Sequence, residues 1–127
     1  MLNNTELKDI LKEINLEEKV NMLHGDGLFQ TKGVKRLGIP PFVMSDGPMG
    51  VRREFSQRSW DEKGYSDDSV SYFPSNTALA ATWNREHAYA FGKALGAEVR
   101  SRGKDVILAP GINIIRSPFC GRNFEYM

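Results

Sequence analysis

Cysteine is almost absent from this sequence, and its scarcity excludes two kinds of stabilising chemistry. Cys120 is the only cysteine among 127 residues. No disulfide can therefore form within the chain, and the paired-cysteine spacings of zinc sites are missing. The two histidines, His24 and His87, lie far apart and outside any HxH or HExxH pattern. We therefore expect no metal site, and we interpret Cys120 as a small packing residue.

The sequence also lacks an excess of charge of one sign and any long apolar run. Seventeen Lys and Arg against sixteen Asp and Glu give a net charge of +1, so neither nucleic acid nor an anionic membrane is expected as a partner. No stretch approaches the roughly 18 apolar residues of a membrane span, and residues 1–20 carry no signal-peptide pattern. These features predict a cytoplasmic globular protein.

Helical spacing of apolar residues predicts two helices at the start of the chain. The first covers 5–14, with Asn4 or Thr5 as its N-cap. Asn15, followed three residues later by Glu18, resembles a capping box and starts the second helix almost at once.

The remainder of the chain has the pattern of an α/β protein. Apolar runs at 42–44, 77–83 and 106–108 indicate strands, and a long helix is predicted from the Asn84 cap to Arg102. Polar residues gather just after the strand ends, which is where sites are built in βα architectures. The aperiodic segment 53–72 is longer than an ordinary connection, which is typical of a functional or mobile loop.

Five segments of the chain have distinctive sequences. They are LEEKVNMLHG (16–25), RLGIPPFVMSDGPMGVR (36–52), FPSNTALAATWN (73–84), GAEVRSRGKDVILAPGINI (96–114) and RSPFCGRNFEYM (116–127). In order and in register, these segments resemble the amino-terminal signature of family 3 glycoside hydrolases, and they cover most of the chain after Asn15. The most specific are the SDGP…GVR and GRNFEY blocks.

This resemblance implies a fold and an activity. Residues 1–127 would form the N-terminal part of a (β/α)8 TIM-barrel-like domain, with about the first three strands after the N-terminal helices. The full protein would be a β-glucosidase-type glycosidase that hydrolyses β-glucosides or related β-glycosides with retention, through two carboxylates and without a metal or organic cofactor. The family's nucleophile and acid/base lie on later segments. We therefore expect a truncated fragment, with no catalytic residue assigned and no activity alone.

Three residues are predicted to bind the sugar. Asp46 follows the strand at 42–44, and its carboxylate can accept hydrogen bonds from two adjacent hydroxyls, whereas Arg52 and Arg122 can donate in a fixed fork. The alternatives are an Asx turn for Asp46 and structural ion pairs for the two arginines. The family motif positions favour substrate binding, and they make Arg116 and Glu125 supports for the loop that holds Arg122.

Other interpretations of the chain stay open at this point. The aromatic residues in or beside the long loop could stack on sugars, but such rings more often pin a loop and are given no role; they are Trp60, Tyr65, Tyr72 and Phe73. The chain could instead be a non-catalytic carbohydrate-binding or interaction fragment, or have no function in isolation. Unpaired strand edges in an incomplete barrel predict self-association or aggregation.

Overall fold

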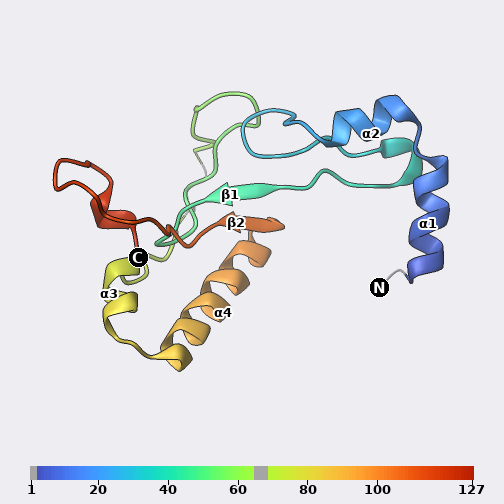
Figure 1. Ribbon diagram of the computed structural model, residues 1–127. Coiled ribbons are helices and arrows are strands. Elements are labelled where there is room, and N and C mark those ends of the chain that lie inside the picture. Colours follow the sequence, from blue (N-terminus) through green and yellow to red (C-terminus); the bar gives the residue numbers. More distant parts are fainter. Residues whose placement is uncertain (1–2, 65–68) are drawn as a thin grey trace. The chain divides into compact units, whose positions relative to one another are not determined.

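The computed structural model of this chain describes residues 3–64 and 69–127, and these form two compact units (Figure 1). Unit 1 comprises Met1–Val43 with Gln57–Ser59, and unit 2 comprises Met44–Ser56 with Trp60–Met127. Tyr65, one of the aromatic residues of the long loop, lies outside the described residues.

Unit 1 begins with the two predicted helices. Helix α1 (Asn4–Glu13) is capped by Asn3, one residue earlier than expected, and this cap is itself a capping box. Helix α2 (Leu16–Met22) begins with the predicted capping box: Asn15 Oδ1 accepts from Glu18 N at 2.9 Å, and Glu18 Oε2 accepts from Asn15 N at 3.0 Å. Each box satisfies amide donors that have no partner inside the helix.

Glu18 also links α2 to the short 3-10 helix η1 (Lys35–Leu37). Arg36 donates from Nη2 to Glu18 Oε2 at 2.8 Å and from Nε to Glu18 Oε1 at 3.2 Å. The hydrogen bond from Arg36, followed by the one from the Asn15 backbone, lowers the pKa of Glu18.

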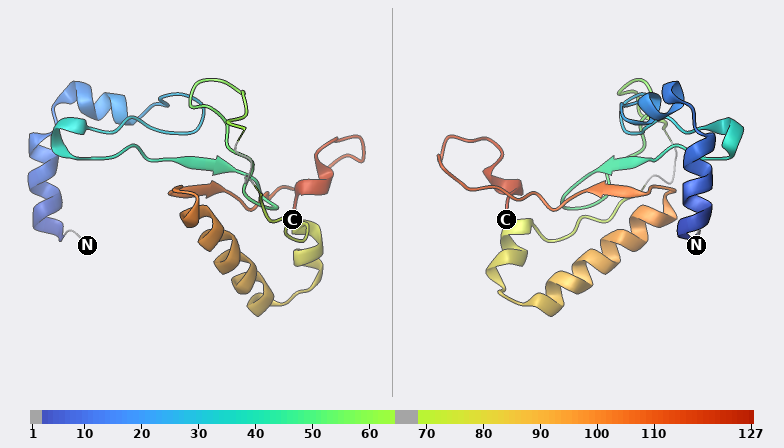
Figure 2. Two further views of the ribbon diagram at one scale, coloured as in Figure 1. Left: turned by 180° about the vertical axis from the view of Figure 1, so that it is seen from behind. Right: turned by 45° about the vertical axis from the view of Figure 1, so that its right-hand side comes forward.

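Unit 2 is built on two parallel strands joined by two helices, which is a βαβ arrangement. The strands pair in register, with Met44 opposite Val106 and Asp46 opposite Leu108. All views show α4 running beneath this strand pair (Figures 1 and 2). The elements are β1 (Met44–Asp46), α3 (Asn76–Ala81), α4 (Arg85–Ser101), β2 (Val106–Leu108) and the 3-10 helix η2 (Asn123–Glu125).

The core of unit 2 lies between α4 and the strands. Leu95 and Val99 on one face of α4 pack with Val51, and all three are at most 4% exposed. Partly buried residues surround them: Phe73, Phe91, Ile107 and Ala109. The predicted N-cap Asn84 is confirmed, because its side chain accepts from Glu86 N and His87 N.

One expectation about unit 2 is wrong. The apolar run at 77–83 forms helix α3 instead of a strand, so the described residues contain two strands and not three. Ser75 caps this helix by accepting from Ala78 N at 3.2 Å, and its Ala- and Leu-rich sequence favours a helix. In α4, no atom lies within 4 Å of the Cβ that Gly92 or Gly96 would carry, so both positions face open space.

The Glu18–Arg36 pair gives a pH-dependent prediction. Because the pKa of Glu18 is lowered in the fold, its contribution is present above the unfolded value and is lost as pH falls through the folded value. Glu18→Gln keeps a capping side chain but loses the ion pair. We expect the variant to unfold at a lower temperature than the parent at pH 7, with the difference vanishing towards pH 3. A difference in thermal midpoint that is independent of pH would contradict this explanation.

Candidate functional site

A tight turn follows β1 and brings Arg52 back to Asp46. Gly50 N donates to Gly47 O at 3.3 Å, and Arg52 N donates to Asp46 O at 3.4 Å, which closes the turn. Gly47 has φ +124°, and a Cβ at this position would lie 1.8 Å from Gly50 O. Only glycine fits here. The sequence DGPMG therefore fixes both predicted sugar-binding residues at the carboxyl end of β1.

The Asp46 carboxylate is exposed and makes one hydrogen bond in the described part of the chain. Its Oδ1 accepts from Gly47 N at 2.9 Å. This bond supports the alternative interpretation of Asp46 as a turn-stabilising residue. A carboxylate has about four lone-pair sites, so one bond to the turn leaves acceptor capacity for a hydroxyl group. The two interpretations are therefore compatible.

The Arg52 guanidinium lies in a partly buried, partly aromatic environment. Its Cζ is 4.9 Å from the centroid of the Phe55 ring and 5.1 Å from that of Trp60. Burial lowers the pKa of Arg52, and the negative charges of Asp46 and Glu54 oppose this change. The Asp46 carboxylate thus acts electrostatically on Arg52 as well as through the backbone turn.

Glu54 attaches the segment that carries Arg52 to the far end of α4. Lys104 Nζ donates to Glu54 Oε2 at 2.8 Å, and Arg102 Nε lies 3.7 Å from Glu54 Oε1. The three side chains are only 14–16% exposed. A carboxylate at such burial requires partners, because an unpaired buried charge is strongly destabilising. The pairing therefore restrains the chain just beyond Arg52.

The segment after β2, residues 111–127, is closed on itself and on α3. Met127 N donates to Gly111 O at 2.9 Å. Asn76, which is 0% exposed, donates from Nδ2 to Glu125 O at 2.9 Å, and Thr77 Oγ1 donates to Tyr126 O at 2.7 Å. Figure 1 shows the C-terminus beside α3 in agreement with these bonds. They hold the part of this segment that contains Arg122.

Arg122 pairs with Glu125 in the segment that follows β2. The Arg122 Nε donates to Glu125 Oε1, and this hydrogen bond is the main cause of the raised pKa of Arg122, to which the Asp46 charge also contributes. The Arg122 side chain is 71% exposed. Its guanidinium carries five N–H donors, so the pair with Glu125 uses only part of its capacity.

Of the two residues expected to support Arg122, one contacts it in the structure and the other does not. Glu125 does so directly through the ion pair. Arg116, by contrast, is exposed and makes no hydrogen bond or ion pair with any residue that the structure describes. No contact therefore supports the expected role of Arg116 in holding the loop.

Several residues around the site could not be found from the sequence pattern. The Glu54–Lys104 pair joins positions that are 50 residues apart. In the sequence, Glu54 is simply an acidic residue two positions after Arg52, which does not indicate its partner. Asn76 gave no signal, because the run that follows it was predicted as a strand and not as helix α3. Trp60 was seen in the sequence, but nothing there indicated its contact with Arg52.

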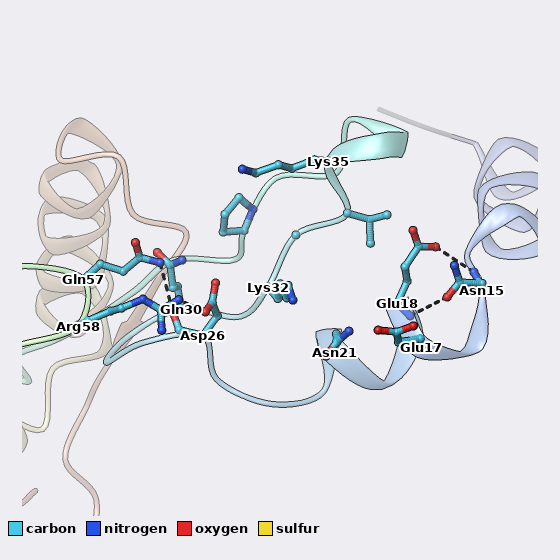
Figure 3. A pocket seen from close by; sticks show the side chains of 13 residues that line it. Asn15, Glu17, Glu18, Asn21, Asp26, Gln30, Lys32, Lys35, Gln57 and Arg58 are labelled. Atoms are coloured by element: carbon cyan, nitrogen blue, oxygen red, sulfur yellow. Dashed lines mark hydrogen bonds and ion pairs between the residues drawn. The ribbon is translucent and has the colours of Figure 1, made fainter.

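A polar pocket of about 870 Å³ lies within unit 1 and contains none of the predicted site residues (Figure 3). Many of its polar groups already have partners: Asn15 and Glu18 cap α2, and Arg58 Nη2 binds Asp26 Oδ1 at 2.6 Å. Its lining is Asn15, Glu17, Glu18, Asn21, Asp26, Gln30, Lys32, Gly33, Val34, Lys35, Pro41, Gln57 and Arg58. The pairing favours a structural role for this pocket.

A second, apolar groove of about 390 Å³ lies between α3 and α4 in unit 2, and none of the predicted sugar-binding residues lines it.

Across residues 3–64 and 69–127, no three His, Cys, Asp or Glu side chains are grouped so that they could hold a metal ion. Within the same ranges, every helix is too short or too polar to cross a membrane.

The fold and the site define a class of protein: an α/β domain with a carboxylate and two guanidinium groups beyond the ends of parallel strands. The family model described as "Glycosyl hydrolase family 3 N terminal domain" matches residues 1–126. The chain belongs to this family. The resemblance found in the five sequence segments is thereby confirmed.

Similar proteins include several named β-glucosidases and an exo-α-(1→6)-L-arabinopyranosidase of Bifidobacterium longum, to which the chain is 36% identical over 118 residues. The chain is 48% identical over 121 residues to β-glucosidase BoGH3A of Bacteroides ovatus and 45% identical over 123 residues to thermostable β-glucosidase B of Acetivibrio thermocellus. Each match covers 95% of this chain and 16% of the relative. The solved structure of β-glucosidase 3B from Thermotoga neapolitana in complex with glucose is similar, with a TM-score of 0.79 and 40% identity over 94% of this chain and 18% of that one.

The turn after β1 gives a stability prediction with a matched control. Gly47→Ala places a Cβ against the backbone of Gly50 at a φ that disfavours side chains, so we expect a loss of more than about 3 kcal/mol in the free energy of unfolding. Gly92→Ala in α4 meets no atom within 4 Å and should stabilise slightly, by up to about 1 kcal/mol. Chemical denaturation measures both. Equal stability of the two variants would show that the turn is not constrained as described.

Proposed function

We propose that the protein containing this chain is a retaining glycosidase that hydrolyses β-glucosides or related β-glycosides. In this proposal the chain supplies part of the subsite for the non-reducing sugar, through Asp46, Arg52 and Arg122. One observation carries the assignment: Asp46 and Leu108 lie opposite each other at the ends of the paired parallel strands, so the segments that carry Arg52 and Arg122 leave from the same edge of the sheet. The family membership and the names of the relatives support the reaction type.

The three side chains suit a hexose chemically. Each sugar hydroxyl can donate one hydrogen bond and accept two, so a carboxylate can accept from neighbouring hydroxyls while the guanidinium groups donate to the same or adjacent oxygens. The Thermotoga neapolitana relative binds glucose in its solved structure, and we extend a small carbohydrate ligand of this kind to the present chain.

We further propose that residues 1–127 form the N-terminal part of a (β/α)8 barrel-like domain. The parallel pairing of β1 and β2 through a helical crossover supports this architecture. The two carboxylates of retaining hydrolysis would then come from other segments of the protein, because the present chain matches only 16% of its relatives' length. A cytoplasmic location stays a prediction from the sequence.

A second candidate function is carbohydrate binding without catalysis. The observation that favours it is that Asp46, Arg52 and Arg122 all lie in unit 2, so part of the binding subsite could form without the catalytic carboxylates. Self-association is a related proposal: Leu108 at the open side of β2 is 47% exposed, and Ile112 and Ile114 beyond it are at least 70% exposed.

Substitution of Asp46 in the full-length natural protein tests the proposed function. Asp46→Asn removes a charge-assisted acceptor, which contributes about 1.5–3 kcal/mol, and we expect kcat/KM on an aryl β-glucoside to fall about 10- to 100-fold. The inhibition constant for glucose should rise in parallel. Asp9→Asn changes an exposed acid of α1 that pairs with Lys12; it is the control and should retain full activity. Equal losses in both variants would refute the assignment of Asp46.

Measurements on the 127-residue chain and on the full-length protein together distinguish the two candidate functions. Hydrolysis of an aryl β-glucoside is not expected from the 127-residue chain, since it holds no assigned nucleophile. Calorimetric titration with glucose should show at most millimolar affinity that disappears in Asp46→Ala. If the full-length protein binds glucose but hydrolyses no β-glycoside, the binding function replaces the glycosidase.

A further inference from the structure

The long loop after Arg52 folds back on itself and presents two aromatic rings to that arginine. Ser56 N donates to Asp61 O at 2.9 Å, and a backbone bridge joins Phe55 to Glu62 in antiparallel fashion. This pairing sets the Phe55 and Trp60 rings edge to face, with centroids 5.6 Å apart and planes at 73°. Such a geometry is favourable for aromatic pairs.

Arg52 is held by both members of this pair. Its guanidinium carbon lies 4.9 Å from one ring centroid and 5.1 Å from the other, which is inside the range of a cation–π contact. Glu54, fixed by Lys104, restrains the backbone between Arg52 and the first ring. A planar guanidinium packed against rings directs its N–H groups outward in its own plane, and a lysine cannot reproduce this.

Trp60 nevertheless keeps most of its surface in solvent, with 62% of the residue exposed. Tyr89 on α4, which is 74% exposed, makes no contact with Arg52. A large exposed apolar surface beside polar groups that converge is typical of a ligand site, where apolar lining is combined with a few placed polar groups.

We infer that Phe55 and Trp60 form an aromatic wall of the carbohydrate site, in which Phe55 positions Arg52 and Trp60 stacks on the apolar C–H face of the bound sugar. A pyranose has a polar rim of hydroxyls and apolar faces, so Asp46 and Arg52 would hold the rim while the indole covers a face. This inference rests on the proposed function, and it adds a contact residue and a positioning residue to it.

The test uses Trp60→Ala and Trp60→Phe in the full-length protein, with Tyr89→Ala as the control. Loss of the indole should raise both KM for an aryl β-glucoside and the inhibition constant of glucose about three- to thirtyfold, with kcat changed less than threefold. Trp60→Phe should restore most of the affinity because it keeps a ring. Tyr89→Ala should match the parent protein in every constant.

Phe55 and Arg52 are tested by the same assay. Phe55→Leu keeps the apolar volume but removes the ring, so its thermal midpoint should stay close to the parent value while KM rises. Arg52→Lys should lose affinity to a similar extent, and combining it with Phe55→Leu should add little, because both changes disturb one guanidinium. Fully additive losses would contradict a positioning role for Phe55.

The outcomes distinguish this inference from the proposed function. If the parent protein is active and Trp60→Ala leaves KM and glucose inhibition unchanged, the aromatic wall is refuted while the glycosidase stands. If the parent protein hydrolyses no β-glycoside, calorimetric titration with glucose decides: weaker binding by Trp60→Ala supports the wall, and equal binding refutes it. Should Trp60→Ala fail to fold, Trp60→Leu takes its place, and unchanged constants in that variant refute the wall.

Discussion

The parallel pairing of β1 with β2 is the constraint on which the candidate site depends. Asp46 and Leu108 are opposite each other at the ends of the two strands, so the segments that follow both strands leave from the same edge. One of these segments carries Arg52 and the other carries Arg122. Strands of three residues are too short to be stable alone. The contacts of Leu95 and Val99 with Val51, just beyond β1, supply the apolar burial that the pairing requires.

Electrostatic interactions then orient the charged side chains that follow the two strands. Arg52 and Arg122 each have a local carboxylate, Glu54 and Glu125 respectively, and both also interact with the charge of Asp46. The nearby Glu54 has cations of its own in Lys104 and Arg102. The charged groups of the candidate site are therefore accompanied by groups of opposite charge. A sugar hydroxyl entering the site would meet groups that are already oriented, which reduces the entropy lost on binding.

The sequence predicted features that depend on neighbours along the chain. Capping of α2 by Asn15 and of α4 by Asn84 followed from side chains that bind amides two or three residues away, and β2 followed from an uninterrupted apolar run. The run at 77–83 was wrongly assigned to a strand, because a short apolar stretch has no period that separates strand from buried helix. Features that join distant positions were beyond pattern reasoning. The contact of Lys104 with Glu54 spans 50 residues, and the position of Trp60 against Arg52 depends on a hairpin that the sequence did not reveal.

The central claim is that Asp46 and Arg122 converge on one sugar. The most direct test is a crystal structure of the full-length protein with glucose bound. We expect one glucose molecule to donate a hydroxyl hydrogen bond to the Asp46 carboxylate and to accept a hydrogen bond from the Arg122 guanidinium, at about 2.7–3.0 Å for each. Glucose bound without either side chain, or the two side chains pointing into separate cavities, would contradict it.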